Sequence, residues 1–122
     1  MRRIKFRGKS KDTGEWLYGA LIPNGKKSAC IAPFKKALAL ESVKPETVGQ
    51  FIGLLDKNGK EIYEGDITKA DSGEIYEICW YDDLASFMGE MVYNEKPFML
   101  FDIETAKQTV IGNIHDNPEL LT

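Results

Sequence analysis

Few side chains in this sequence of 122 residues could carry out acid–base chemistry. The single histidine, His115, is followed by Asp116, and a histidine beside a carboxylate is a common proton-transfer pair. In an extended strand, however, neighbouring residues point to opposite faces, so these two side chains would not meet. The run from His115 to Pro118 is instead typical of a turn, and we expect no catalytic residue there.

Carboxylates gather at two places, and oxygen ligands of this kind suit Mg²⁺ or Ca²⁺. One group consists of Glu61, Glu64 and Asp66, and the other of Asp82 and Asp83. Neither group has the closely spaced run of oxygen ligands found in a calcium loop. The pattern favours solvated turns, and we expect neither a metal nor a cofactor.

Other catalytic signatures are missing from the sequence. A Gly-x-Ser-x-Gly nucleophile motif does not occur, and the eleven glycines are spread over turns without phosphate-loop spacing. Cys30 and Cys79 stand alone in apolar runs, which indicates buried free thiols in a reducing compartment. We therefore expect a protein that is not an enzyme.

The basic residues near the N-terminus are the feature most suggestive of binding. Two aromatic residues, Trp16 and Tyr18, follow them and could stack on nucleic-acid bases. Such a basic face could dock a protein partner or, alternatively, a nucleic-acid backbone. It could also be the solvent-exposed side of an edge strand that charged residues protect from aggregation. The candidate basic contacts are Arg2, Arg3, Lys5, Arg7, Lys9, Lys11, Lys26 and Lys27.

Charge is distributed unevenly along the chain. Residues 1–36 hold ten basic and two acidic residues, whereas residues 37–122 hold six basic and seventeen acidic ones. The net charge of the whole chain is only -3, which argues against a strongly basic nucleic-acid binder. The asymmetry indicates a charged protein partner or head-to-tail self-association, unless the two regions fold together and neutralise one another.

Alternation of side chains predicts the first strand. In residues 3–7, Ile4 and Phe6 would face a core, while Arg3, Lys5 and Arg7 would form a basic row in water on the other face. Further short strands are expected at 16–22, 28–33, 48–55, 62–63, 67–69, 74–81, 87–93, 98–101 and 110–114.

Short strands separated by frequent turns predict a mainly β fold with little helix, built as a small barrel or an SH3-like or sandwich arrangement. Residues 35–44 fit either a helix or a strand, and residues 117–121 fit a short helical turn or a docked end. We expect one domain over 1–122, with a possible division into an N-terminal hairpin region, 1–47, and a small barrel, 48–122.

The cellular location is predicted from the length and position of the apolar segments. No export signal follows Met1, and no run approaches the roughly 18 apolar residues that a membrane-spanning helix needs. We expect a cytoplasmic protein that does not contact a membrane.

Three blocks of the sequence resemble one family. Residues 52–67 (IGLLDKNGKEIYEGDI) resemble the central signature of the YopX family, residues 110–121 (VIGNIHDNPELL) its C-terminal signature, and residues 4–7 its opening. Many members continue that opening with Ala-Trp-Asp, whereas this chain continues with Gly8-Lys9-Ser10, so any role of that loop does not carry over.

The resemblance implies a mainly β protein encoded by a bacteriophage or prophage, and it implies no catalytic residue. Within the central signature, Asn58 and Gly59 are typical of a hairpin turn. Gly65 permits unusual backbone angles, and Asp66 can bond nearby amides, which predicts a structural corner. We expect an accessory module that binds a protein partner or another copy of itself, and alternatively one that binds nucleic acid.

Overall fold

The computed structural model describes residues 3–23, 28–34, 40–92, 97–99 and 104–122. These residues form eleven strands and four short 3₁₀ helices, the longest of four residues. The expectation of a mainly β fold with little helix is therefore confirmed. The chain makes two compact units, Met1–Phe51 and Ile52–Thr122, and the boundary between them falls within the strand Gly49–Leu55.

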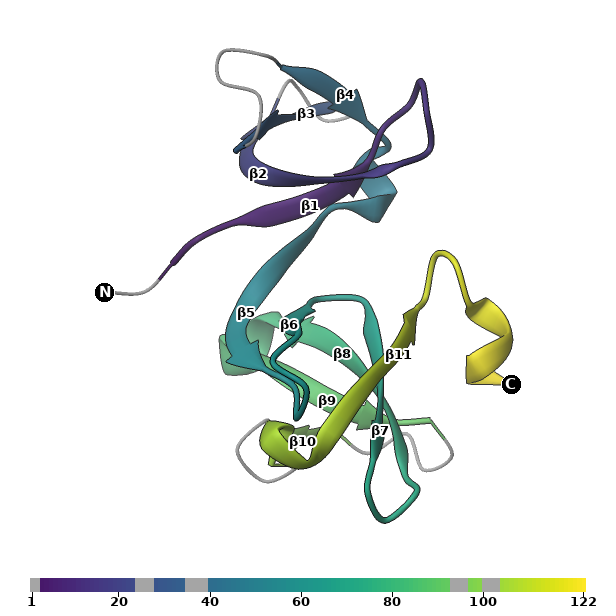
Figure 1. Ribbon diagram of the computed structural model, residues 1–122. Coiled ribbons are helices and arrows are strands. Elements are labelled where there is room, and N and C mark those ends of the chain that lie inside the picture. Colours follow the sequence, from purple (N-terminus) through teal and green to yellow (C-terminus); the bar gives the residue numbers. More distant parts are fainter. Residues whose placement is uncertain (1–2, 24–27, 35–39, 93–96, 100–103) are drawn as a thin grey trace. The chain divides into compact units, whose positions relative to one another are not determined.

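The first unit is an antiparallel sheet in the order β4-β3-β2-β1-β5 (Figure 1). A 3₁₀ turn, Pro45–Thr47, connects β4 to β5. Alternating apolar residues and intervening turn residues produce the strands, as the sequence pattern requires. Their bounds are β1 Phe6–Lys9, β2 Trp16–Pro23, β3 Ala29–Pro33, β4 Glu41–Val43 and the beginning of β5 Gly49–Leu55.

One face of this sheet supplies the core of the first unit. Ile31 and Val43 have no exposed surface, and Phe6, Leu17 and Leu21 pack against them. Strand β2 comes so close to β3 that a side chain at Gly19 would collide with the backbone of Ala32. This close contact explains why a residue without a Cβ atom stands in the middle of a strand.

The second unit contains a five-stranded sheet in the order β10-β9-β8-β7-β11 (Figure 1). The remainder of β5 forms a hairpin with β6. The elements of this unit are β6 Glu61–Tyr63, β7 Asp66–Ala70, β8 Ile75–Tyr81, η2 Asp82–Leu84, β9 Ser86–Met91, β10 Pro97–Met99, η3 Thr105–Lys107, β11 Gln108–Asn113 and η4 Pro118–Leu121.

The core of the second unit lies between this hairpin and the five-stranded sheet. Ile62 of β6 packs with Tyr76 and Ile78 of β8, and Ile52 and Phe87 complete the cluster. Among the described residues, neither sheet is a closed barrel, although a bridge between Ser10 and Val43 joins β4 to the end of β1. The hairpin lying against the sheet fits the sandwich alternative within this unit.

Several local expectations can be compared with the structure. Strand β8 spans Ile75–Tyr81, close to the expected 74–81, and the tail forms the 3₁₀ helix Pro118–Leu121. Strand β1 begins at Phe6 and not at residue 3. Of the ambiguous segment 35–44, residues 41–43 form a strand and residues 35–39 lie outside the described residues. No described helix is long and apolar enough to cross a membrane.

Candidate functional site

The face of the first sheet that points away from its core combines cations with aromatic rings. In β1, Arg7 pairs with Tyr18 and Lys9 pairs with Trp16. Paired residues of an antiparallel ladder share a face, so these four side chains lie on one side of β1 and β2. Phe6, which alternates with them, packs against the core on the other side. We call this side the basic–aromatic face.

The cations of this face lie over the rings. The guanidinium carbon of Arg7 is 4.6 Å from the centre of the Trp16 ring, and the Lys9 Nζ is 5.6 Å from the same ring. Lys5 lies over Phe51 of β5, with its Nζ 5.2 Å from the ring centre. At these distances the negative face of an aromatic ring attracts a cation, so the rings hold the basic side chains in place.

The expected basic row in water is wrong in part. Lys5 and Arg7 are only 7% and 5% exposed, whereas Ile4, expected in the core, is largely exposed. Alternation correctly places Lys5 and Arg7 on the side of β1 opposite Phe6. Their exposure differs from the expectation because long basic side chains bury their aliphatic stems on apolar surface when aromatic rings are available. Trp16 and Phe51 provide those rings, so Lys5 and Arg7 belong to the framework of this face.

The remaining candidate contacts differ in accessibility. Arg3 and Lys11 are exposed, and Lys9 and Trp16 are half-buried. Tyr18 is 44% exposed. Three further candidates, Arg2, Lys26 and Lys27, lie outside the described residues.

A groove of about 470 Å³ opens beside Tyr18. Sequence reasoning missed Phe34, which is 57% exposed and whose backbone N–H donates to the Tyr18 carbonyl at 3.2 Å. The only available signal was a large aromatic residue directly after a strand-ending proline. The volume is in the range of small-ligand or side-chain pockets. The groove is lined by Lys5, Glu15, Trp16, Leu17, Tyr18, Pro33, Phe34 and Glu41.

The central signature residues in the second unit have backbone partners. Asn58 and Gly59 form the β5–β6 turn, and Gly59 has a φ of 80°, which glycine adopts without strain. The corner at Gly65 has a φ of 93°, and the Asp66 carboxylate accepts a hydrogen bond from the Tyr63 N–H at 2.8 Å. These residues shape the chain and leave little of the Asp66 carboxylate exposed.

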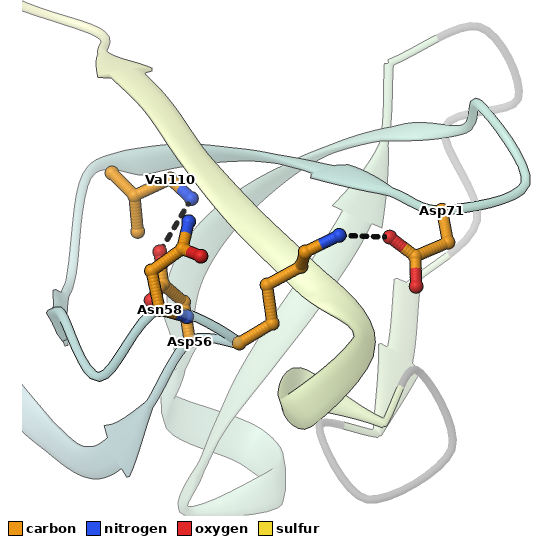
Figure 2. Close-up of polar contacts among 5 residues, drawn as sticks. Asp56, Asn58, Asp71 and Val110 are labelled. Carbon is orange, nitrogen blue, oxygen red and sulfur yellow. Dashed lines mark hydrogen bonds and ion pairs between the residues drawn. The ribbon is translucent and has the colours of Figure 1, made fainter.

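Asp56, which precedes this turn, was not singled out from the sequence. Its Oδ1 accepts the N–H groups of Asn58 and Lys60 at 2.8 and 2.9 Å. Its Oδ2 accepts the N–H of Val110 at 3.0 Å (Figure 2). Burial by itself raises the pKa of this carboxyl, but the three N–H donors outweigh burial and hold the pKa below its usual value. Asp56 thus joins the hairpin to β11.

The C-terminal signature forms a turn in the same manner. The side-chain oxygen of Asn113 accepts the N–H groups of His115 and Asp116 at 3.0 and 2.9 Å. The Asn117 Oδ1 accepts the N–H of Asn113 at 3.2 Å, and Gly112 lies so close to Asn117 that a Cβ at Gly112 would collide with that side chain. The motif therefore ends β11 and leads the chain into η4.

Acidic and sulfur groups meet on β8 and β9. Glu77 lies directly opposite Glu90, and burial together with Glu90 raises the pKa of Glu77. Burial, reinforced by both glutamates, raises the pKa of the Cys79 thiol to about 12. A hydrogen bond of 2.9 Å to Glu90 is the main cause that raises the pKa of Tyr81 to about 12. A thiol with so high a pKa is a poor nucleophile at neutral pH.

Metal-ligating side chains do not converge in the part of the chain that the structure describes. There, no group of three or more His, Cys, Asp or Glu side chains is arranged to hold a metal ion. In the first unit, the exposed rings of Tyr18 and Phe34 line a groove together with the half-buried Trp16.

Comparison with known proteins identifies the family. The family described as YopX protein matches residues 5–122. The crystal structure of protein EF1440 from Enterococcus faecalis is 26% identical over 100% of both chains, with a TM-score of 0.63. The search of curated proteins gives no match. The family match extends over nearly the whole chain, and the chain belongs to the YopX family.

Proposed function

We propose that this chain is a phage- or prophage-encoded accessory module of the bacterial cytoplasm that works by binding and not by catalysis. Its basic–aromatic face docks an acidic protein surface, which belongs to a partner or to another copy of the chain. The observation that carries this proposal is that the exposed ring of Tyr18 lies on the sheet face opposite the core, on the same side as the half-buried Lys9 and Trp16. A face not needed for the core is free to evolve for recognition.

The distribution of charge between the two units supports an acidic partner. The first unit, residues 1–51, holds eleven basic and four acidic residues, and the second, residues 52–122, holds five basic and fifteen acidic residues. A basic unit attracts acidic surfaces over about a Debye length of 8–10 Å and accelerates encounter with them. The signature carboxylates Asp56 and Asp66 bond backbone N–H groups, which supports a structural role for them.

Capture from a lysate of a host bacterium tests the proposal. Immobilised wild-type chain is compared with a variant carrying Arg3→Glu and Lys11→Glu, two exposed residues of the first unit. A matched control carries Lys69→Glu and Lys107→Glu, the same charge change in the second unit. We expect an acidic protein, or the chain itself, to be retained by the wild type and the control and lost in the first variant. Equal retention by all three chains would contradict the proposal.

Nucleic-acid binding is the second candidate, and it rests on a specific observation. Trp16 and Tyr18 lie on the same face as Arg7 and Lys9, and aromatic rings between cations are the elements of a single-strand binding surface. Fluorescence anisotropy of a labelled oligothymidine of roughly 20 nucleotides tests it, because site sizes of such surfaces reach about 16 nucleotides. Salt-sensitive binding that Tyr18→Ala abolishes would favour this candidate over protein docking.

A further inference from the structure

A short antiparallel pairing joins the end of β1 to β4 in the first unit. The N–H of Lys44 donates to the Lys9 carbonyl at 2.9 Å, and the N–H of Lys11 donates to the Ser42 carbonyl at 3.0 Å. In an antiparallel ladder, bonds in this pattern connect residues that stand directly opposite one another. Lys9 therefore lies opposite Lys44, and Lys11 lies opposite Ser42.

The bridge between these two pairs decides which way their side chains point. Ser10 and Val43 form the bridge, and they are 1% and 0% exposed, so they face inward. Successive residues of a strand point to opposite faces, so the four flanking side chains point outward. Their exposure agrees, because three of them are exposed and the fourth is half-buried. We call these four residues the lysine patch: Lys9, Lys11, Ser42 and Lys44.

Two of the three lysines have no carboxylate partner among the described residues. Like charges at opposed positions repel and destabilise an antiparallel pair. No described carboxylate forms an ion pair with Lys11 or Lys44, although Asp12 and Glu46 lie close to them in the chain. All four acidic residues of the first unit belong to its described part: Asp12, Glu15, Glu41 and Glu46. The first unit therefore supplies no carboxylate that pairs with these two ammonium groups.

Thr47 holds the two opposed lysines together. The N–H of Lys9 donates to the Thr47 Oγ1 at 2.9 Å, and the same hydroxyl donates to the Lys44 carbonyl at 2.6 Å. Thr47 is 5% exposed, so water has little access to this link. The backbone of the patch is thus formed without a ligand, which lowers the entropy that a ligand would lose by ordering it.

We infer that the lysine patch binds a phosphoryl group that carries two negative charges, as a phosphate monoester does at neutral pH. An ammonium group offers three N–H donors and no acceptor, and the Ser42 hydroxyl can also donate. Lysine binds phosphate as a point charge, whereas the planar fork of arginine matches carboxylates. A dianion compensates two of the three positive charges, whereas a carboxylate or a phosphodiester compensates one. This inference goes beyond the proposed docking of an acidic protein.

Titration of the ¹⁵N-labelled full chain with sodium phosphate tests the inference. Sodium chloride is adjusted so that the ionic strength stays constant, which separates binding from screening. We expect saturable shifts of the Lys11, Ser42 and Lys44 amide signals, and sulfate, which has the same shape and charge, should cause them as well. Shifts that do not saturate, or that chloride alone reproduces, would overturn the inference.

Matched variants show whether the patch itself holds the anion. The patch variant carries Lys11→Gln and Lys44→Gln, and the control carries Lys69→Gln and Lys107→Gln, two exposed lysines of the second unit. The patch variant should raise the dissociation constant for phosphate about tenfold, because exposed charge contacts contribute up to about 1 kcal/mol each.

The control should bind phosphate like the wild type, and equal dissociation constants for all three chains would overturn the inference. Replacing the side chain of Lys44 leaves its backbone bonds to Lys9 and Thr47 in place. Lys44→Gln alone therefore repeats the test if the patch variant does not fold, with Lys69→Gln as its control.

Two further probes identify the source of the phosphoryl group. Glycerol 3-phosphate carries a monoester dianion, whereas a short oligothymidine without a terminal phosphate carries only diester groups. We expect glycerol 3-phosphate to shift the same amide signals as phosphate and to bind more tightly than the oligothymidine at equal ionic strength. If the oligothymidine shifts these signals and both monoester and inorganic phosphate do not, the dianion is overturned as ligand and the nucleic-acid candidate is favoured.

Failure of this inference can be told from failure of the proposed function. A wild-type chain that does not bind phosphate, but retains an acidic protein that Arg3→Glu and Lys11→Glu release, overturns the phosphate site and leaves the docking function standing. A chain that binds phosphate at the lysine patch and captures no acidic protein supports the site and contradicts the docking function.

Discussion

The carboxylate of Asp56 gives the most quantitative prediction about the second unit. Asp56→Ala removes an acceptor of three backbone N–H groups, those of Asn58, Lys60 and Val110, and leaves these donors without it. Hydrogen bonds to a charged acceptor contribute about 1.5–3 kcal/mol each, and such contributions add incompletely within one network. We therefore expect the free energy of unfolding to fall by roughly 3–5 kcal/mol, a large share of a typical total of about 5–15 kcal/mol.

A milder change separates charge from shape. Asp56→Asn keeps one oxygen, which can still accept from Asn58 and Lys60, but turns an NH₂ group toward the Val110 N–H. One bond and the charge are lost, so we expect a loss of about 2 kcal/mol. Asp71→Ala is the control, because this exposed carboxylate forms an ion pair with Lys57 at 2.9 Å and accepts no set of backbone N–H groups like that of Asp56 in the described part of the chain (Figure 2). An exposed ion pair contributes about 0–1 kcal/mol.

The pH dependence of these losses follows from the direction of the pKa shift. The pKa of Asp56 is lower in the folded state, so the charged carboxylate stabilises the fold above the unfolded value of about 3.9. That stabilisation is lost as the pH falls through the folded pKa. The difference in unfolding free energy between wild type and Asp56→Asn should therefore be largest near neutral pH and shrink in acid.

Urea unfolding followed by tryptophan fluorescence measures this effect. The chain has two tryptophans, Trp16 in the first unit and Trp80 in the second, so a Trp16→Phe background reports on the second unit alone. A loss below about 1 kcal/mol for Asp56→Ala, or equal losses for Asp56→Ala and Asp71→Ala, would refute the role assigned to the three N–H bonds.

Three further predictions concern other parts of the chain. Gly19→Ala should cost the first unit about 1–3 kcal/mol, because the added Cβ collides with the Ala32 backbone. Urea unfolding followed by Trp16 fluorescence in a Trp80→Phe background measures this loss, and unchanged stability would contradict the close approach. In a Cys30→Ser background, Cys79 should resist iodoacetamide at pH 8 until urea unfolds the protein, since its pKa is raised to about 12; rapid labelling of folded protein would contradict this. Glu77→Gln should raise the melting temperature at pH 7, because burial and Glu90 raise the folded pKa of Glu77 and the charged carboxylate therefore opposes folding above about pH 4.3. The gain should vanish in acid, where the carboxyl is protonated in both the folded and the unfolded state. A lowered melting temperature at pH 7 would contradict the direction of the pKa shift.

Local patterns in the sequence predicted the local structure well. Alternation placed β8 to within one residue at its start, and it identified the core face of β1 through Phe6. Glycine and asparagine marked the turn at Asn58 and Gly59 because their backbone preferences act over a few residues. These features depend on neighbouring residues alone, and a single sequence contains that information.

Features that depend on distant residues could not be predicted in this way. Alternation assigned Lys5 and Arg7 to a face but did not reveal that Phe51 and Trp16 lie beneath them, because that depends on strand register. The Asp56 carboxylate bonds the N–H of Val110, which is 54 residues away in the chain. The groove beside Phe34 likewise requires β2, β3 and β4 to be placed together.

The ¹⁵N NMR spectrum of the full chain tests most directly whether the basic–aromatic face binds. Spectra are recorded along a dilution series and after addition of the protein recovered by capture. The account predicts salt-sensitive shifts of the Trp16 indole signal and of the Tyr18 and Phe34 amides in at least one of the two experiments. If signals from other parts of the chain shift while the Trp16 indole and the Tyr18 and Phe34 amides do not, the claim that this face binds would be contradicted.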